Sequence, residues 1–132
     1  MSLDRLSNML SALKNASMAK KVKIEVIYSK ECESVAKVLK KQSILQDVKV
    51  FKPREKPHKM ISLTLNREGE SFALNDLKRI SKPGRRVYSS SKGLRTLAGS
   101  HEIVILSTSR GIMDRVDAQK KNLGGEVICR AH

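Results

Sequence analysis

Aromatic side chains are scarce in this chain of 132 residues. There is no tryptophan, and two phenylalanines and two tyrosines make up only 3% of the sequence. Proteins that hold single-stranded nucleic acid commonly stack successive bases on aromatic rings. So few rings argue against a stacking platform of that kind.

Long apolar runs are also missing. No segment approaches the roughly 20 apolar residues that a membrane-spanning helix needs. The opening residues, MSLDRLSNML, contain no basic segment followed by an apolar stretch, so we expect no signal peptide. No long amphipathic helix presents a Trp/Phe face that would insert into a membrane surface, so we expect no membrane partner.

Cysteine is nearly absent. Cys32 and Cys129 lie far apart in the sequence and belong to no metal-ligand spacing. We expect both to be small, buried hydrophobic residues of a protein in a reducing compartment. The sequence therefore predicts no metal site and no cofactor.

Acidic residues are outnumbered two to one. The chain has 27 Lys and Arg against 13 Asp and Glu, which gives a formal net charge of +14. Such an excess makes the compact state repel itself unless a polyanion is near. Together with the scarcity of aromatic rings, this charge favours a structured RNA or a duplex, held through its backbone and its shape.

The spacing of apolar residues divides the chain into two parts of different character. The first part predicts helix, strand, helix, strand and strand at residues 3–15, 22–27, 29–41, 48–51 and 60–66. Residues 52–58 carry two prolines and four charges, which predicts a loop. The second part has short apolar runs separated by glycine and serine, and predicts mainly strands with short helical pieces at residues 93–98 and 114–121.

We therefore predict an α+β fold. Its N-terminal α/β lobe covers residues 1–68, and its C-terminal, mainly β lobe covers residues 69–132 and holds the main binding site. The two lobes are expected to pack on each other. Local signals support the helices: Ser29 suits the N-cap of the second helix, and Asp114 followed by Asp117 is similar to a capping box.

A basic run without acids occupies residues 77–101. It contains seven Lys and Arg, including Arg85 and Arg86, and Pro83-Gly84 predicts a turn between two basic strand segments. Ordinary surfaces mix charges of both signs, so this run is typical of a face that contacts phosphates. Tyr88 lies inside the run. It is either a core residue or a ring that lies on a sugar or a base.

A cluster of hydroxyls, Ser107, Thr108 and Ser109, follows an apolar strand and precedes Arg110 and Gly111. Together they offer donors, acceptors, a cation and backbone amides. The GxxxxGK[ST] pattern of a P-loop is absent. A serine nucleophile would need a positioned base, and only His101 is placed for that role, without a GxSxG motif. Hydroxyls bond phosphates, base edges and the ribose 2′-OH, so RNA recognition accounts for both the motif and the charge.

Two adjacent glycines, Gly124 and Gly125, precede the last apolar run. Their simplest role is to permit a tight connection from helix to strand, and they would also let a backbone approach closely. Glu126 follows as an acid in a basic lobe. It either pairs with a neighbouring arginine or accepts a hydrogen bond from a base amino group.

Three segments together resemble one family. RISKPGRRVY (residues 79–88), ILSTSRGIM (105–113) and LGGEVIC (123–129) are similar, in order and spacing, to bacterial-type small-subunit ribosomal protein S8. The segments at residues 4–16 and 28–41 are similar to its first two helices. The resemblance implies an N-terminal α/β lobe, a mainly β C-terminal lobe, and direct binding to an irregular helix in the central domain of small-subunit ribosomal RNA, early in subunit assembly.

The resemblance also implies where the RNA contacts lie. They centre on the hydroxyl cluster and the residues around it, with a secondary contact in the first lobe. With the arginines of the basic run added, the predicted rRNA-binding residues are Ser107, Thr108, Ser109, Arg110, Tyr88, Arg86, Arg85, Gly125, Glu126, Ser29 and Lys30.

We predict a structural constituent of the small ribosomal subunit, with no catalytic residues. One alternative within RNA binding is translational repression, in which the same surface binds a messenger RNA mimic of the ribosomal site. An alternative of another class is a small phosphate-handling enzyme that uses Ser107 or Ser109 as nucleophile. The predicted partners are small-subunit rRNA, neighbouring small-subunit ribosomal proteins and, for a repressor, the mRNA of its own operon. We expect a monomer when free, located on cytoplasmic ribosomes, with an organellar ribosome as the open alternative.

Overall fold

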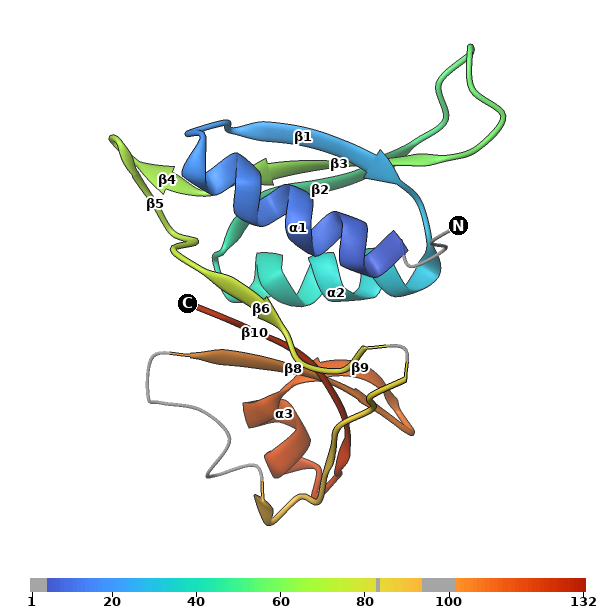
Figure 1. Cartoon of the computed structure of the whole chain (residues 1–132), viewed down its shortest axis with the longest axis vertical. Helices are drawn as coiled ribbons and strands as arrows, with labels where there is room; N and C mark the ends of the chain where they lie inside the picture. Colours follow the sequence, from blue (N-terminus) through green and yellow to red (C-terminus); the bar gives the residue numbers. More distant parts are fainter. Residues whose placement is uncertain (1–4, 83, 94–101) are drawn as a thin grey trace. The chain divides into compact units, whose positions relative to one another are not determined.

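The computed structural model describes residues 5–82, 84–93 and 102–132 (Figure 1). The chain divides into two compact units, Met1–Asn75 and Asp76–His132, each described by itself. This division lies seven residues beyond the boundary after residue 68 that the sequence suggested. The predicted α+β fold class is confirmed.

The first unit is a small antiparallel sheet with two helices on one face (Figure 1). The three-stranded sheet has the order β1-β3-β2, so its central strand is the last of the three in the sequence. A short hairpin, β4–β5, follows it. The elements of this unit are α1 (Arg5–Met18), β1 (Lys23–Ile27), α2 (Lys30–Lys41), β2 (Leu45–Phe51), β3 (Met60–Leu65), β4 (Arg67–Glu68) and β5 (Ser71–Phe72).

The core of the first unit follows from the predicted periodicities. Each helix buries one stripe against the sheet, and the central strand contributes side chains that are 0% exposed. The buried residues are Leu6, Met9, Leu10 and Leu13 of α1, Cys32, Val35, Ala36 and Leu39 of α2, and Ile61, Leu63 and Leu65 of β3. Removing this apolar area from water is the main stabilising contribution to the unit.

Local signals place the second helix correctly. The Ser29 hydroxyl accepts a hydrogen bond of 3.1 Å from the Cys32 amide, which confirms the predicted N-cap. The other bounds differ from prediction by a few residues. Helix α1 continues to Met18 because Ala16 and Ser17 are also buried, and the Ser17 hydroxyl donates to the Leu74 carbonyl.

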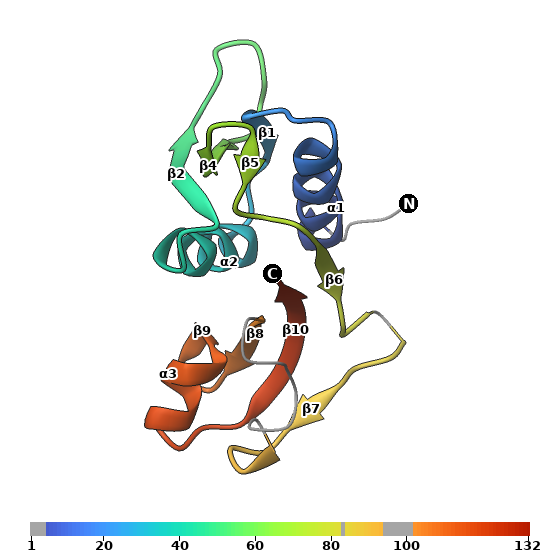
Figure 2. The ribbon, with the colours of Figure 1, turned by 90° about the vertical axis from the view of Figure 1, so that its left-hand side faces the viewer.

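The second unit is a sheet built around the last strand of the chain (Figure 2). Strand β10 lies between β6 and β8, β9 extends the sheet beyond β8, and β7 also pairs with β10. The elements are β6 (Leu77–Arg79), β7 (Tyr88–Ser89), β8 (Ile103–Thr108), β9 (Gly111–Asp114), α3 (Arg115–Lys120) and β10 (Gly125–Ala131). Their small core is formed by Val104, Leu106, Met113, Ala118 and Val127.

Helix α3 confirms one of the two helical pieces predicted for this unit. The Asp114 carboxylate accepts a hydrogen bond of 2.8 Å from the Asp117 amide and caps the helix. The other predicted piece, at residues 93–98, lies almost wholly outside the described residues, as do Pro83 and His101.

Candidate nucleic-acid interface

Strand β10 brings three of the predicted site residues into one row. Glu126 pairs with Tyr88 of β7 on one side and with Ser107 of β8 on the other. Directly opposed residues in an antiparallel sheet project from the same face. The neighbouring row, Val127 and Leu106, belongs to the core. Side chains alternate along a strand, so the Tyr88–Glu126–Ser107 row lies on the opposite face of the sheet, which we call the outer face. Ile105, two residues before Ser107 on this face, is 0% exposed, whereas Tyr88 at the other end of the row is exposed.

Tyr88 is 72% exposed. The alternative that it is a core tyrosine is therefore wrong. An exposed ring on a sheet face offers its flat side to a sugar or a base, and its hydroxyl offers a donor and an acceptor. Tyr88 is the one aromatic residue among the predicted site residues, in a chain that has only two tyrosines and two phenylalanines.

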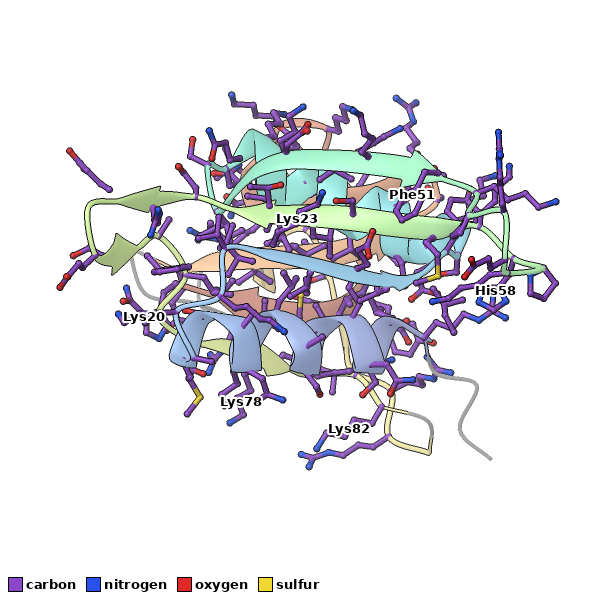
Figure 3. All side chains as sticks on the ribbon, turned by 90° about the horizontal axis from the view of Figure 1, so that it is seen from above. Lys20, Lys23, Phe51, His58, Lys78 and Lys82 are labelled. Carbon is purple, nitrogen blue, oxygen red and sulfur yellow. The ribbon has the colours of Figure 1, made fainter. Side chains whose placement is uncertain are left out.

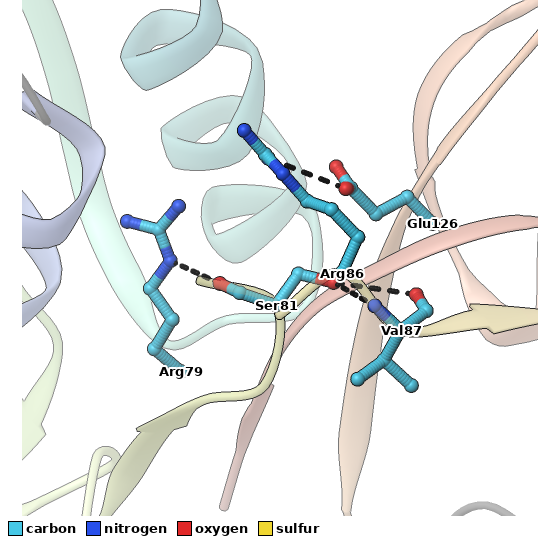
Figure 4. A network of polar contacts seen from close by, with 5 residues as sticks. All are labelled: Arg79, Ser81, Arg86, Val87 and Glu126. Atoms are coloured by element: carbon cyan, nitrogen blue, oxygen red, sulfur yellow. Dashed lines mark hydrogen bonds and ion pairs between the residues drawn. The ribbon is translucent and has the colours of Figure 1, made fainter. Parts of the chain in front are cut away.

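Glu126 pairs with an arginine, which was one of the two roles open to it. Its carboxylate accepts a hydrogen bond from the Arg86 guanidinium at 3.3 Å (Figure 4). The carboxylate side chain is 19% exposed and the arginine side chain 51% exposed. The pair therefore lies at the surface, with the acid on the sheet and the cation reaching over it. Arg86 is held against the protein by Glu126.

A second set of hydrogen bonds shapes the chain just before Arg86. The Ser81 hydroxyl accepts from the Val87 amide at 2.9 Å and donates to the Val87 carbonyl at 3.2 Å (Figure 4). Lys82 and Arg85 exchange two backbone hydrogen bonds, and Gly84 has a φ of +84° between them. The predicted turn is thus present around Gly84. Arg85 is exposed after this turn, and it forms no ion pair with any residue that the structure describes.

The hydroxyl cluster lies at the end of the β8–β9 hairpin. Thr108 pairs with Gly111, and Ser109 and Arg110 form the exposed tip between them. The Thr108 hydroxyl donates to the Gly111 carbonyl at 2.8 Å and accepts from the Arg110 amide at 3.2 Å. Thr108 therefore closes the turn. Among the described residues, the side chains of Ser107, Ser109 and Arg110 make no such bond, and those of Ser109 and Arg110 are exposed.

Of the two roles predicted for the glycine pair, the close approach of a backbone is confirmed. The left-handed residue after α3 is Asn122, with a φ of 55°, and neither Gly124 nor Gly125 has a positive φ. A Cβ on Gly125 would lie 2.2 Å from the Ser107 carbonyl oxygen, and one on Gly124 would lie 2.4 Å from the Ser89 carbonyl oxygen. The two glycines are therefore required by the close approach of β10 to β8 and β7, which is what assembles the outer row.

Ser29 and Lys30, the predicted secondary contact, belong to the first unit. The Ser29 hydroxyl is engaged as the cap of α2, and Lys30 is exposed in the first turn. Of these two residues, Lys30 is therefore the one whose side chain can contact a phosphate.

Charge is divided equally between the units. The first unit has 15 Lys and Arg against 8 Asp and Glu, and the second has 12 against 5, so each carries +7. The acid-free run lies in the second unit, and the main binding site was predicted there. Residues 52–58 were predicted as a loop and nothing more, although three of these seven residues are cations and Lys59 follows them.

Possible metal ligands and cysteines were also located in the described part of the chain. Within residues 5–82, 84–93 and 102–132, no group of three His, Cys, Asp or Glu side chains is placed to hold a metal ion. Cys32 and Cys129 are buried, as predicted, and neither forms a disulfide. Burial raises the pKa of the Cys129 thiol to about 12, against a smaller opposing effect of Arg79. No helix in the described part of the chain is long and apolar enough to span a membrane.

Comparison with known proteins gives one consistent result. A model of the family described as ribosomal protein S8 matches residues 4–132. A small ribosomal subunit protein uS8c from Morus indica is 36% identical over 135 residues, which cover 98% of this chain and 98% of the relative. Proteins named small ribosomal subunit protein uS8 from Nostoc punctiforme and Crocosphaera subtropica are 37% and 38% identical, covering 96% of this chain and 95% of each relative.

Proposed function

The chain belongs to the ribosomal protein S8 family, and from this premise we propose that it binds small-subunit ribosomal RNA directly through the outer face of its second unit. As a member of the family, it is a structural component of the small ribosomal subunit. The proposal concerns how it attaches there and with which residues.

One observation carries the proposal: the Tyr88–Glu126–Ser107 row on the outer face of the sheet. Two of its side chains offer direct contacts to RNA, and the third positions a cation. The ring stacks on a sugar or a base, the hydroxyl bonds a phosphate or a 2′-OH, and the carboxylate holds Arg86 beside them. Arg85 and Arg110, both exposed, lie in the adjoining turns and supply cations for phosphates.

The partner we propose is an irregular helix in the central domain of small-subunit rRNA, bound early in subunit assembly. A regular RNA helix has a deep, narrow major groove that side chains cannot read, whereas an irregular helix also presents unstacked bases. A single exposed tyrosine with flanking hydroxyls and cations suits such a target better than it suits a run of unpaired bases. The protein binds as a monomer, with one copy for each RNA.

The same face would bind any RNA that copies the shape of the ribosomal helix. A messenger RNA mimic is therefore a second ligand of the same site, which is the basis of the repressor alternative. Catalysis is not part of the proposal. In the described hairpin, the bonds of the Thr108 hydroxyl run to backbone groups, and none joins a hydroxyl to a carboxylate or an imidazole.

Chemical footprinting of the purified protein on full-length small-subunit rRNA tests the proposal. We expect protection confined to one irregular helix of the central domain, at equal protein and RNA concentrations. Addition of an operon messenger RNA as competitor measures the repressor alternative in the same assay. Protection that is absent, or spread evenly over the RNA, would contradict direct and specific binding.

A further inference from the structure

The loop that joins β2 to β3 concentrates the free cations of the first unit. This β2–β3 loop, residues 52–59, extends beyond the end of the sheet (Figures 1 and 3). It contains Lys52, Arg54, Lys56 and Lys59 against a single acid, Glu55, and all five are exposed. Apart from two prolines it has no apolar side chain.

The cations of the loop differ from those of the neighbouring helix α2 in having no acidic partner. Lys37 lies 3.5 Å from Glu33, and Lys40 lies 3.6 Å from Asp47, so their charges are partly neutralised. Among the described residues, no ion pair involves the loop residues 52, 54 or 56. The positive potential of this end of the unit is therefore not screened by its own acids.

The loop is anchored at both ends. Met60, the first residue of β3, pairs with Phe51 on one side and with Ile27 on the other. The Tyr28 amide donates to the Lys59 carbonyl at 3.0 Å, and the Lys59 ammonium lies 5.6 Å from the centre of the Tyr28 ring.

A turn within the loop positions its tip. The Lys56 amide donates to the Pro53 carbonyl at 3.5 Å, which places Arg54 and Glu55 at the tip. Two prolines restrict the backbone on either side of that turn. A restricted loop loses less conformational entropy when it binds.

We propose that the β2–β3 loop is a second RNA contact, made to the phosphate backbone and separate from the outer face of the second unit. The inference rests on the proposed RNA binding but assigns a site that neither the motifs nor the family resemblance supplied. RNA is favoured over a protein partner because the loop has four cations and, apart from two prolines, no apolar side chain to anchor a protein interface. A contact made by four cations with no base-reading group would be insensitive to sequence.

A tethered cleavage reagent locates the loop on RNA. Cys32 and Cys129 are 0% exposed, so a thiol introduced by Glu55→Cys is the one that reacts with an iron chelate, and this change keeps all four cations. We expect hydroxyl radicals from position 55 to cut full-length small-subunit rRNA at nucleotides different from those cut in a Ser109→Cys protein. Cleavage from position 109 without cleavage from position 55 would overturn the inference. The reverse result would support the loop and contradict the proposed face of the second unit.

A charge-matched pair of variants gives an independent test. The loop variant is Lys52→Gln/Arg54→Gln/Lys56→Gln, and the control, Lys37→Gln/Lys40→Gln/Lys41→Gln, removes the same charge from α2. Each lost phosphate contact lowers the slope of log affinity against log salt by about 0.7 to 0.9. We expect the loop variant to lower the slope by about 2 to 3, by that measure, and the control by less than one contact. Equal slopes for the two variants would overturn the inference, provided that both keep the melting temperature of the parent.

Discussion

The guanidinium of Arg86 donates a hydrogen bond to the carboxylate of Glu126 across 3.3 Å, from a loop to the central strand of the second unit. This pair places an arginine of the basic run beside the row that holds Tyr88 and Ser107. The positive charge of Arg86 also offsets the negative charge of Glu126, the one acid of that row, which would otherwise repel a phosphate. Arg86 and Arg85, adjacent in sequence, therefore have different roles at the interface.

The two arginines should respond differently to substitution. Arg85→Ala removes an exposed cation, so the slope of log affinity against log salt should fall by about 0.7 to 0.9. Arg86→Ala also leaves the Glu126 carboxylate unpaired on the RNA face, so its affinity should fall further. Glu126→Gln added to Arg86→Ala should recover that further loss. Affinities measured by filter binding across a salt series check this, and identical behaviour of the two single variants would contradict the role of the pair.

Gly125 should not tolerate even one added methyl group. A Cβ would lie 2.2 Å from the Ser107 carbonyl oxygen, so Gly125→Ala must push β10 away from β8. Forced overpacking of this kind typically costs about 1 to 3 kcal/mol. We expect the free energy of unfolding in urea to fall by that amount and specific RNA binding to fall with it. Gly93→Ala is the control, because its added Cβ meets no backbone atom and only two side-chain hydroxyls, that of Ser89 at 3.0 Å and that of Ser90 at 3.5 Å.

Substitution of Thr108 should affect stability, whereas substitution of Ser109 should affect RNA binding. Thr108→Ala removes two hydrogen bonds that close the hairpin, so it should lower stability by about 0.5 to 1.5 kcal/mol for each bond, and Thr108→Ser should restore most of the loss. Ser109→Ala should leave the melting temperature unchanged. If the exposed hydroxyl bonds RNA, that change should weaken specific binding by about 1 to 3 kcal/mol. Unchanged discrimination between the cognate and a scrambled helix would remove Ser109 from the recognition surface.

Burial of Cys129 should make stability fall in alkaline solution. Its pKa is raised from 9.0 to about 12 in the folded protein, so above pH 9 the unfolded chain releases a proton that the folded chain retains. Stability is fully present below pH 9 and is lost as the pH rises toward 12. At pH 10 the loss should be about 1.4 kcal/mol relative to a Cys129→Ala protein that follows the same pH series. If the free energy of unfolding in urea changes by the same amount in both proteins between pH 8 and pH 10, this prediction is contradicted.

The local part of the fold could be predicted from the sequence. Ser29 and Asp114 were identified as caps because a cap involves residues only three apart. The apolar spacing of α2 likewise specifies the stripe that the helix buries. Each of these inferences needs only a few consecutive residues.

The arrangement of the site could not be predicted in this way. Tyr88, Ser107 and Glu126 were candidates from motifs, but their common row depends on how β7, β10 and β8 pair, and spacing along the chain does not determine register. The glycine pair was predicted to serve a tight connection or the close approach of a backbone, but the strands that approach it, β7 and β8, are distant in sequence and could not be named. The binding roles of these residues remain predictions.

The central claim is that the outer row of the second unit binds RNA, and Tyr88 tests it most directly. Its side chain is 72% exposed, so Tyr88→Ala should leave stability within about 0.5 kcal/mol of the parent. Val116, 48% exposed on α3 and outside the row, is the control for loss of an exposed apolar side chain.

The measurement is the dissociation constant for the cognate rRNA helix and for a scrambled helix of equal length, with melting temperatures recorded alongside. Loss of one stacked base costs about 1 to 3 kcal/mol, so Tyr88→Ala should weaken cognate binding by about 5-fold to 150-fold. Tyr88→Phe should keep most of the affinity, and Val116→Ala all of it. Binding of the scrambled helix should stay the same in each protein. A Tyr88→Ala protein that is folded and binds the cognate helix as tightly as the parent would contradict the account.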